Sequence, residues 1–135
     1  MDGVVKLYVL PGDGFPDVDR AIESFGEIIA ESVILPTRRL DLEKNNPYSY
    51  FAYVLASEYL DAQAREALPC FLENGEFDCL VLMQPTYDLK GEIIRVRQSP
   101  RVFRSGVSLR EGLLIPTNPK FLRFETLLDG WLHHA

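Results

Sequence analysis

A run of arginine side chains is the feature of this sequence that most clearly suggests binding chemistry. Between Glu92 and Glu111 the chain carries several arginines and no acidic residue. Guanidinium groups make paired hydrogen bonds to carboxylates and phosphates. The segment therefore predicts a surface for a small anionic ligand or a protein partner, with a solvated or internally neutralised face as the alternative. The candidate residues are Arg95, Arg97, Arg101 and Arg104.

The two cysteines offer a second kind of chemistry. Asn74 and Gly75 tolerate the positive φ angles of a type I′ turn, so residues 70–82 are predicted to form a β-hairpin. In that register Cys70 faces Cys79, and the pair could switch between dithiol and disulfide. The alternative is that both are small, buried residues of the sheet.

Histidine is scarce, which restricts the other chemistry. A zinc site that used the cysteines would need two further ligands, and the histidines present are the adjacent His133 and His134. Acid–base catalysis by histidine has no central candidate either. We therefore expect no metal site, and a binding module is a better reading of the sequence than an enzyme.

A tyrosine-rich segment and a loop carry further candidate residues. The segment 47–63 is predicted to be a helix, and its aromatic side chains fall on more than one face. Tyrosines are enriched at interfaces, so the segment predicts a partner surface, while cover by residues 84–118 is the alternative. The candidates here are Asp13 and Phe15 in the loop 11–15, and Tyr48 and Tyr50 in the helix.

The first half of the chain has the pattern of a βαβ unit. Residues 4–10 form a nearly continuous apolar run, which predicts a central strand buried on both faces. An apolar helical face after Pro16 predicts a helix that continues to about residue 29. A second strand is predicted over 33–42, and Pro36 within it indicates an edge strand. The two strands are expected to be parallel.

The second half is less regular. Residues 84–118 contain one short predicted strand, at 92–97, and are otherwise predicted to be an irregular insertion. Asn118 and Pro119 have the pattern of a helix start, and a last helix is predicted to run to Leu132.

The predicted element order, β-α-β-α-β-β-α, resembles the thioredoxin-like arrangement. That fold places a proline before its third strand, usually after a cis peptide bond, and Pro69 stands at this point. Residues 34–76 are most similar to the arsenical-resistance metallochaperone family. The similarity lies in Pro47-Tyr48-Ser49-Tyr50-Phe51 and in Ala67-Leu68-Pro69-Cys70-Phe71-Leu72-Glu73-Asn74-Gly75-Glu76.

The resemblance implies a single thioredoxin-like α/β domain over residues 1–135, with a central mixed sheet and with 84–118 inserted before the last helix. It also implies that Pro69 lies beside the binding loop. Both families use cysteines in the loop after the first strand, but here residues 11–15 contain none. Without a thiolate there is no nucleophile for disulfide exchange and no soft metalloid ligand. No metal-binding residue carries over, and no cofactor is implied.

Composition and charge limit the partners. The chain has 135 residues, of which 47% are hydrophobic and 25% charged, as in globular proteins. Its net charge is −6, yet residues 1–94 hold 7 basic and 17 acidic groups while residues 95–135 hold 7 and 3. An acidic chain without a nucleic-acid-binding motif is not expected to bind nucleic acid. No apolar run spans a bilayer, no signal-peptide pattern is present, and two cysteines fit a reducing compartment, so a cytoplasmic, membrane-free location is expected.

Three functions follow from these observations. The first is a non-catalytic binding or interaction module for an unknown protein or a small anionic ligand. The second is a thiol-based redox or metalloid-responsive protein that uses Cys70 and Cys79. The third is a structural homodimer, paired through the edge strand at Pro36 or through the arginine segment.

Overall fold

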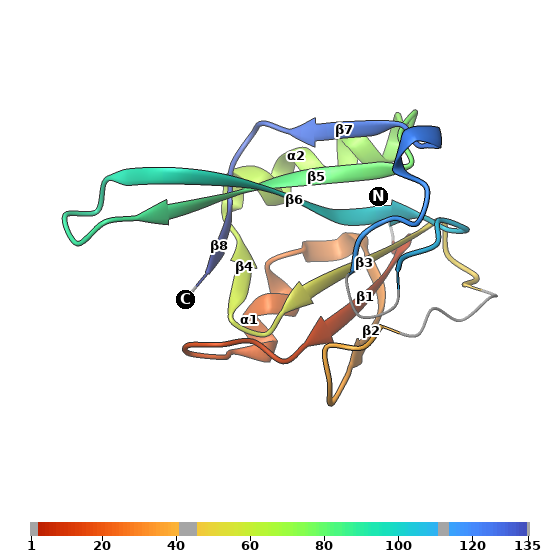
Figure 1. The fold of residues 1–135 in the computed structure, drawn as a ribbon. Coiled ribbons are helices and arrows are strands. Elements are labelled where there is room, and N and C mark those ends of the chain that lie inside the picture. Colours follow the sequence, from red (N-terminus) through yellow and green to blue (C-terminus); the bar gives the residue numbers. More distant parts are fainter. Residues whose placement is uncertain (1–2, 41–45, 111–113, 135) are drawn as a thin grey trace.

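A six-stranded mixed sheet forms the centre of the computed structural model, which describes residues 3–40, 46–110 and 114–134 (Figure 1). Its strands, in order across the sheet, are β2 (Ile29–Ile34), β1 (Val5–Leu10), β3 (Tyr50–Leu55), β6 (Ile93–Arg104), β5 (Cys79–Tyr87) and β7 (Phe124–Leu127). A second sheet pairs β4 (Glu58–Leu60) with β8 (Leu132–His134). The helices are α1 (Val18–Glu23) and α2 (Ala62–Glu73), with 3-10 turns η1 (Gly26–Ile28) and η2 (Pro119–Phe121).

The predicted central strand is confirmed. All six residues of β1 are buried, and β1 pairs in parallel with β2 on one side and β3 on the other. The expected parallel pairing of the first two strands is thus correct, and β2 is an edge strand. However, β2 ends at Ile34, before Pro36, and Leu40 lies outside any strand. The predicted continuation through Leu42 falls outside the described residues.

The first helix is shorter than the sequence predicts. Asp17 caps α1 by accepting a hydrogen bond from the backbone N–H of Arg20 at 3.1 Å. The helix then ends at Glu23 instead of reaching residue 29. Gly26 has a φ of 73°, which an α-helix does not permit, and the chain turns through η1 into β2.

The helix predicted over 47–63 is wrong, because this segment forms β3 and β4. Residues Tyr50–Leu55 are aromatic or apolar at every position, and all but Leu55 are buried. Such a run is typical of a central strand covered on both faces. The aromatic residues fall on more than one face of the predicted helix because, in the strand, their side chains alternate between the two faces of the sheet.

The predicted hairpin over 70–82 is also wrong. The helix α2 begins after Asp61, whose carboxylate accepts from the Ala64 backbone N–H at 3.0 Å, and it includes Cys70 in its last turn. Asn74 therefore caps the end of a helix and makes no hairpin turn. Pro69 lies inside α2, and no peptide bond in the described part of the chain is cis, so the expected cis-proline before a strand is also corrected.

The segment expected to be irregular contains the longest strand. β5 and β6 pair as an antiparallel hairpin, and its outer part projects from the rest of the molecule (Figure 1). The strand predicted at 92–97 is the outer half of β6. The last predicted helix is wrong, since Pro119 starts only the short η2, after which the chain forms β7 and β8.

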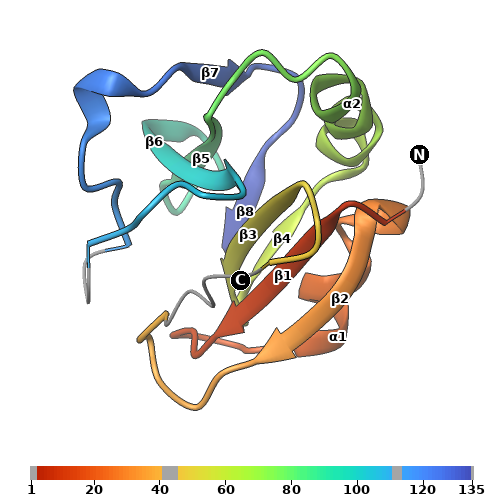
Figure 2. The same cartoon turned by 90° about the vertical axis from the view of Figure 1, so that its right-hand side faces the viewer.

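Core side chains cover both faces of the sheet. Val5, Leu7 and Val9 belong to a cluster that includes residues of α1 and α2, and both helices lie toward one side of the sheet (Figure 2). Tyr8 and Leu10 point to the other face, into a second buried cluster. The expectation of an α/β fold around a central mixed sheet is confirmed, while the observed order of helices and strands differs from the predicted one.

Candidate functional site

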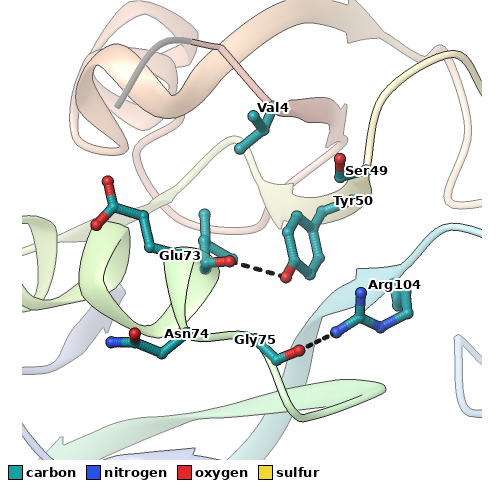
Figure 3. Close-up of a pocket in the computed structure, with 8 residues that line it drawn as sticks. Val4, Ser49, Tyr50, Glu73, Asn74, Gly75 and Arg104 are labelled. Carbon is teal, nitrogen blue, oxygen red and sulfur yellow. Dashed lines mark hydrogen bonds between the residues drawn. The ribbon is translucent and has the colours of Figure 1, made fainter.

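A pocket of about 400 Å³ lies where the first residues of β3 meet the end of α2 (Figure 3). It contains two residues that the sequence singled out for binding, Tyr50 and Arg104. The lining residues are Val4, Ser49, Tyr50, Leu72, Glu73, Asn74, Gly75 and Arg104.

Arg104 is held in place by the backbone beyond α2. The pairing of β3 with β6 sets it opposite Tyr50, and its guanidinium carbon is 5.4 Å from the centre of the Tyr50 ring. Its Nε donates to the carbonyl of Phe77 at 3.1 Å, and Nη2 donates to the carbonyl of Gly75. The other terminal nitrogen, Nη1, points toward the Tyr50 ring and the pocket (Figure 3). It has no hydrogen-bond partner among the residues that the structure describes.

Tyr50 forms the wall of the pocket and ties β3 to α2. Its side chain is buried, it stacks on Phe77 with ring centres 5.7 Å apart, and its hydroxyl donates to the carbonyl of Leu72 at 3.0 Å. Gly75 completes the wall, because a Cβ there would lie 2.1 Å from the Tyr50 hydroxyl oxygen. A larger residue than glycine would therefore displace the tyrosine.

The polarity of the pocket is divided. Arg104 supplies a cationic donor at one side, and Glu73 lies across the pocket from it (Figure 3). Ser49 is exposed at the rim, while Val4 and Leu72 contribute apolar surface. The arrangement suits a small molecule that carries one negative charge and a short apolar part.

Arg101, predicted to bind a ligand, is instead buried in an internal ion pair. Its Nη1 and Nη2 contact the two carboxylate oxygens of Glu58 at 2.5 and 2.8 Å, and its Nε donates to Ser99 at 2.7 Å. The guanidinium also lies over the ring of Tyr53, 4.6 Å from its centre. Burial raises the pKa of Glu58, but the hydrogen bonds and charge of Arg101 outweigh it, so the pKa lies below its ordinary value.

The four candidate arginines do not form one site. Arg95 and Arg97 are exposed on the projecting part of β6, whereas Arg101 is buried and Arg104 lines the pocket. Residues of one extended strand are separated by about 3.3 Å per position, so their closeness in sequence does not make them neighbours.

The cysteines are not a pair. Cys70 is exposed on α2, where the Asn74 side chain donates to its sulfur at 3.4 Å. Cys79 is buried in β5, between Phe103 of β6 and Phe124 of β7. Burial, with a smaller contribution from Asp78, raises the pKa of the Cys79 thiol to about 12. The cross-strand contact expected from the hairpin register does not occur.

The remaining candidates are dispersed. Asp13 lies in the loop after β1 and contacts Arg38 at 3.2 Å, and Phe15 in the same loop is 82% exposed. Tyr48 is half-buried just before β3, with its backbone carbonyl accepting from the hydroxyl of Ser105 at 2.5 Å. Pro69 lines a different pocket, between α2 and η1, so none of these four joins Tyr50 and Arg104.

A second candidate position lies at the carboxyl ends of β1 and β3. A Cβ at Gly12 would lie 2.4 Å from the hydroxyl oxygen of Ser57, so the two loops are in contact there. The Ser57 hydroxyl is 3.0 Å from Nε2 of His134, and Arg38 donates to the carbonyl of Pro11 at 2.8 Å. The chain leaves β1 for β2 on one side and returns to β3 on the other, and open α/β sheets bind ligands at such a point.

Sequence reasoning missed Glu58 and Arg38. Glu58 is the only acidic residue in positions 50–60, a stretch that is otherwise rich in apolar and aromatic residues. A charged side chain in such surroundings needs a buried partner, so the sequence alone indicates that Glu58 is paired. Arg38 had no comparable signal, because its role depends on where the β1 loop lies.

Neither protein-family models nor curated proteins provide a match for this chain. The class that the fold defines is therefore a mixed α/β protein, with no family assigned. Among the residues placed by the structure, no group of three or more histidine, cysteine, aspartate and glutamate side chains is arranged to hold a metal ion. No helix within the described ranges is long and apolar enough to cross a membrane.

Proposed function

We propose that the protein is a binding module whose ligand is a small organic anion held in the Tyr50–Arg104 pocket. The observation that carries the proposal is the position of Arg104, whose Nη1 is directed at the pocket while its other nitrogens are bound to backbone carbonyls. A carboxylate at Nη1 would make a charge-assisted hydrogen bond without displacing an existing one.

The surroundings favour one negative charge over several. Glu73 lines the same pocket, and the end of α2 carries partial negative charge from its last carbonyl groups. Both repel a phosphate more strongly than a monocarboxylate. The apolar contribution of Val4 and Leu72 favours a ligand with a short hydrocarbon part, so butyrate is a suitable probe.

The test is titration of the isotope-labelled protein with butyrate, followed by NMR. We expect saturable shifts of the amide signals of Ser49, Tyr50 and Gly75. In Arg104→Gln the affinity should fall about ten- to a hundredfold, the equivalent of one hydrogen bond to a charged group. Because this substitution also removes two backbone contacts, Ser49→Glu serves as a second variant that weakens binding by repulsion alone. Equal affinity in the wild type and both variants would refute the proposal.

The carboxyl ends of β1 and β3 are the second candidate site for an anion, favoured by the strand order β2-β1-β3 and by the half-exposed Arg38. Parallel titrations with inorganic phosphate and a nucleoside diphosphate distinguish the two sites. Loss of binding in Arg38→Gln but not in Arg104→Gln would assign the ligand to this edge.

The other functions considered from the sequence remain predictions. A redox role for Cys70 and Cys79 has no support from their positions, since each thiol is in a separate environment. A relationship to thioredoxin-like proteins or to the arsenical-resistance metallochaperones rests on the sequence resemblance, and the proposed ligand site does not use it.

A further inference from the structure

The outer part of the β5–β6 hairpin, residues 83–98, is here called the ribbon, and it leaves one long strand edge open. β6 pairs with β3 only at Val102, Phe103 and Arg104. From Ile93 to Ser99, no strand in the described ranges pairs with the edge of β6 that faces away from β5. An open edge offers backbone N–H and C=O groups to an additional strand.

The ribbon has an apolar face. The register places Tyr87 opposite Ile93 and Pro85 opposite Val96, and directly opposite residues share a face. Ile93 is 46% exposed, Ile94 65% and Val96 39%, values unusual for such residues in a strand. On the β5 side this face is partly covered, because the ring of Tyr87 stacks on the ring of His133, with ring centres 6.4 Å apart.

The other face of β6 is basic. Arg95 pairs with Thr86 and Arg97 with Gln84, whereas Val96 pairs with Pro85, so both guanidinium groups lie on the face opposite Val96; the register shifts at Ile94. Both arginines are exposed. The nearest acidic residue along the chain before β6 is Glu92. Its backbone N–H donates to Oδ1 of Asp88 at 2.9 Å.

We propose that the open edge of β6 binds an extended segment of a partner protein in which acidic residues alternate with apolar ones. The acidic side chains lie opposite Arg95 and Arg97, where cross-strand pairs of opposite charge are favourable. The apolar side chains extend the face formed by Ile93 and Val96. This surface is separate from the Tyr50–Arg104 pocket and does not depend on the function proposed for it.

A second copy of this chain is a poorer occupant of the edge. If two β6 strands paired antiparallel around Val96, Arg95 of one would face Arg97 of the other, and like charges opposite each other are destabilising. Shifting the register by one residue removes that conflict, but it sets the apolar face of one ribbon against the basic face of the other. The charges therefore favour an acidic partner over self-association.

The test uses a labelled eight-residue peptide of alternating glutamate and valine, with fluorescence anisotropy as the measure of binding. A peptide with lysine in place of glutamate is the control for charge, and an N-methylated peptide is the control for backbone pairing. We expect saturable binding of the acidic peptide, at least tenfold weaker binding of both controls, and a loss of affinity with rising salt.

Two variants make the test decisive. The double substitution Arg95→Glu and Arg97→Glu should reverse the preference toward the lysine peptide, whereas Arg123→Glu, at an exposed arginine outside the ribbon, should not. Circular dichroism of each variant checks the fold. A ribbon variant that keeps the acidic preference would overturn the proposal. The proposal would also be overturned if the wild-type protein bound none of the three peptides and sedimented as a dimer.

Discussion

Glu58 and Arg101 form a buried ion pair with two hydrogen bonds, which joins the first residue of β4 to the inner part of β6. The side chains are 2% and 6% exposed, respectively. Glu58 also accepts the backbone N–H of Leu55 at 2.7 Å and the side-chain amide of Gln84 at 2.5 Å. Each oxygen of this carboxylate thus accepts two hydrogen bonds, and the donors come from β3, β5 and β6.

Removing one member of this pair should destabilise the protein strongly. Glu58→Leu or Arg101→Met leaves the partner charge buried without its counter-ion, and we expect a loss of about 3–5 kcal/mol in the free energy of unfolding. The measurement is urea denaturation followed by circular dichroism. The matched double variant Glu58→Leu with Arg101→Met should lose less than the sum of the single variants. Strict additivity would show that the two side chains do not interact.

The same pair should make stability depend on acid. The pKa of Glu58 is lower in the folded protein than the ordinary value of 4.5, so the unfolded chain binds a proton first as the pH falls. The stabilisation is present above pH 4.5 and is lost as the pH falls toward the folded-state pKa. Melting temperatures measured from pH 7 downward should therefore fall more steeply below that value in the wild type than in the double variant. Parallel curves would contradict this prediction.

Gly75 and Tyr50 should be energetically coupled. An alanine at position 75 would bring its Cβ to 2.1 Å from the tyrosine hydroxyl oxygen, and overpacking of this kind costs about 1–3 kcal/mol. Tyr50→Phe removes the hydroxyl, so Gly75→Ala should cost less in that background. A double-mutant cycle of unfolding free energies measures the coupling. A cost that is the same with and without the hydroxyl would show that the contact is not the cause.

The two thiols should react at very different rates. Cys70 is exposed, whereas Cys79 is buried with a pKa of about 12, so almost none of it is thiolate near pH 7. With an aromatic disulfide reagent in native buffer we expect one fast thiol, and a second only after denaturation. Cys70→Ser identifies the fast one. Two fast thiols, or an intramolecular disulfide formed under mild oxidation, would instead favour the redox function.

Local signals in the sequence were sufficient for some elements and ambiguous for others. The apolar run of β1 and the Asp17 cap of α1 act over a few residues, so their structures could be predicted. Asn74 favours a turn equally well after a helix or within a hairpin, and the residues before it fit either pattern. The buried positions Ala64, Leu68 and Leu72 recur every four residues, which is the helical signal that the hairpin reading overlooked.

By itself the sequence determined that this protein is α/β, that its first strand is central, and that Tyr50 and Arg104 are candidates for binding. Only the tertiary structure decided what each arginine does. The four candidates lie close together in the chain, but the extended strand separates them in space. The contacts of each arginine therefore depend on which residues of the neighbouring segments lie beside it. Arg101 meets Glu58, 43 positions earlier, and Arg104 meets Gly75, 29 positions earlier, while Arg95 and Arg97 stay exposed. Such contacts depend on strand pairing between distant segments, which no local pattern of residue types specifies.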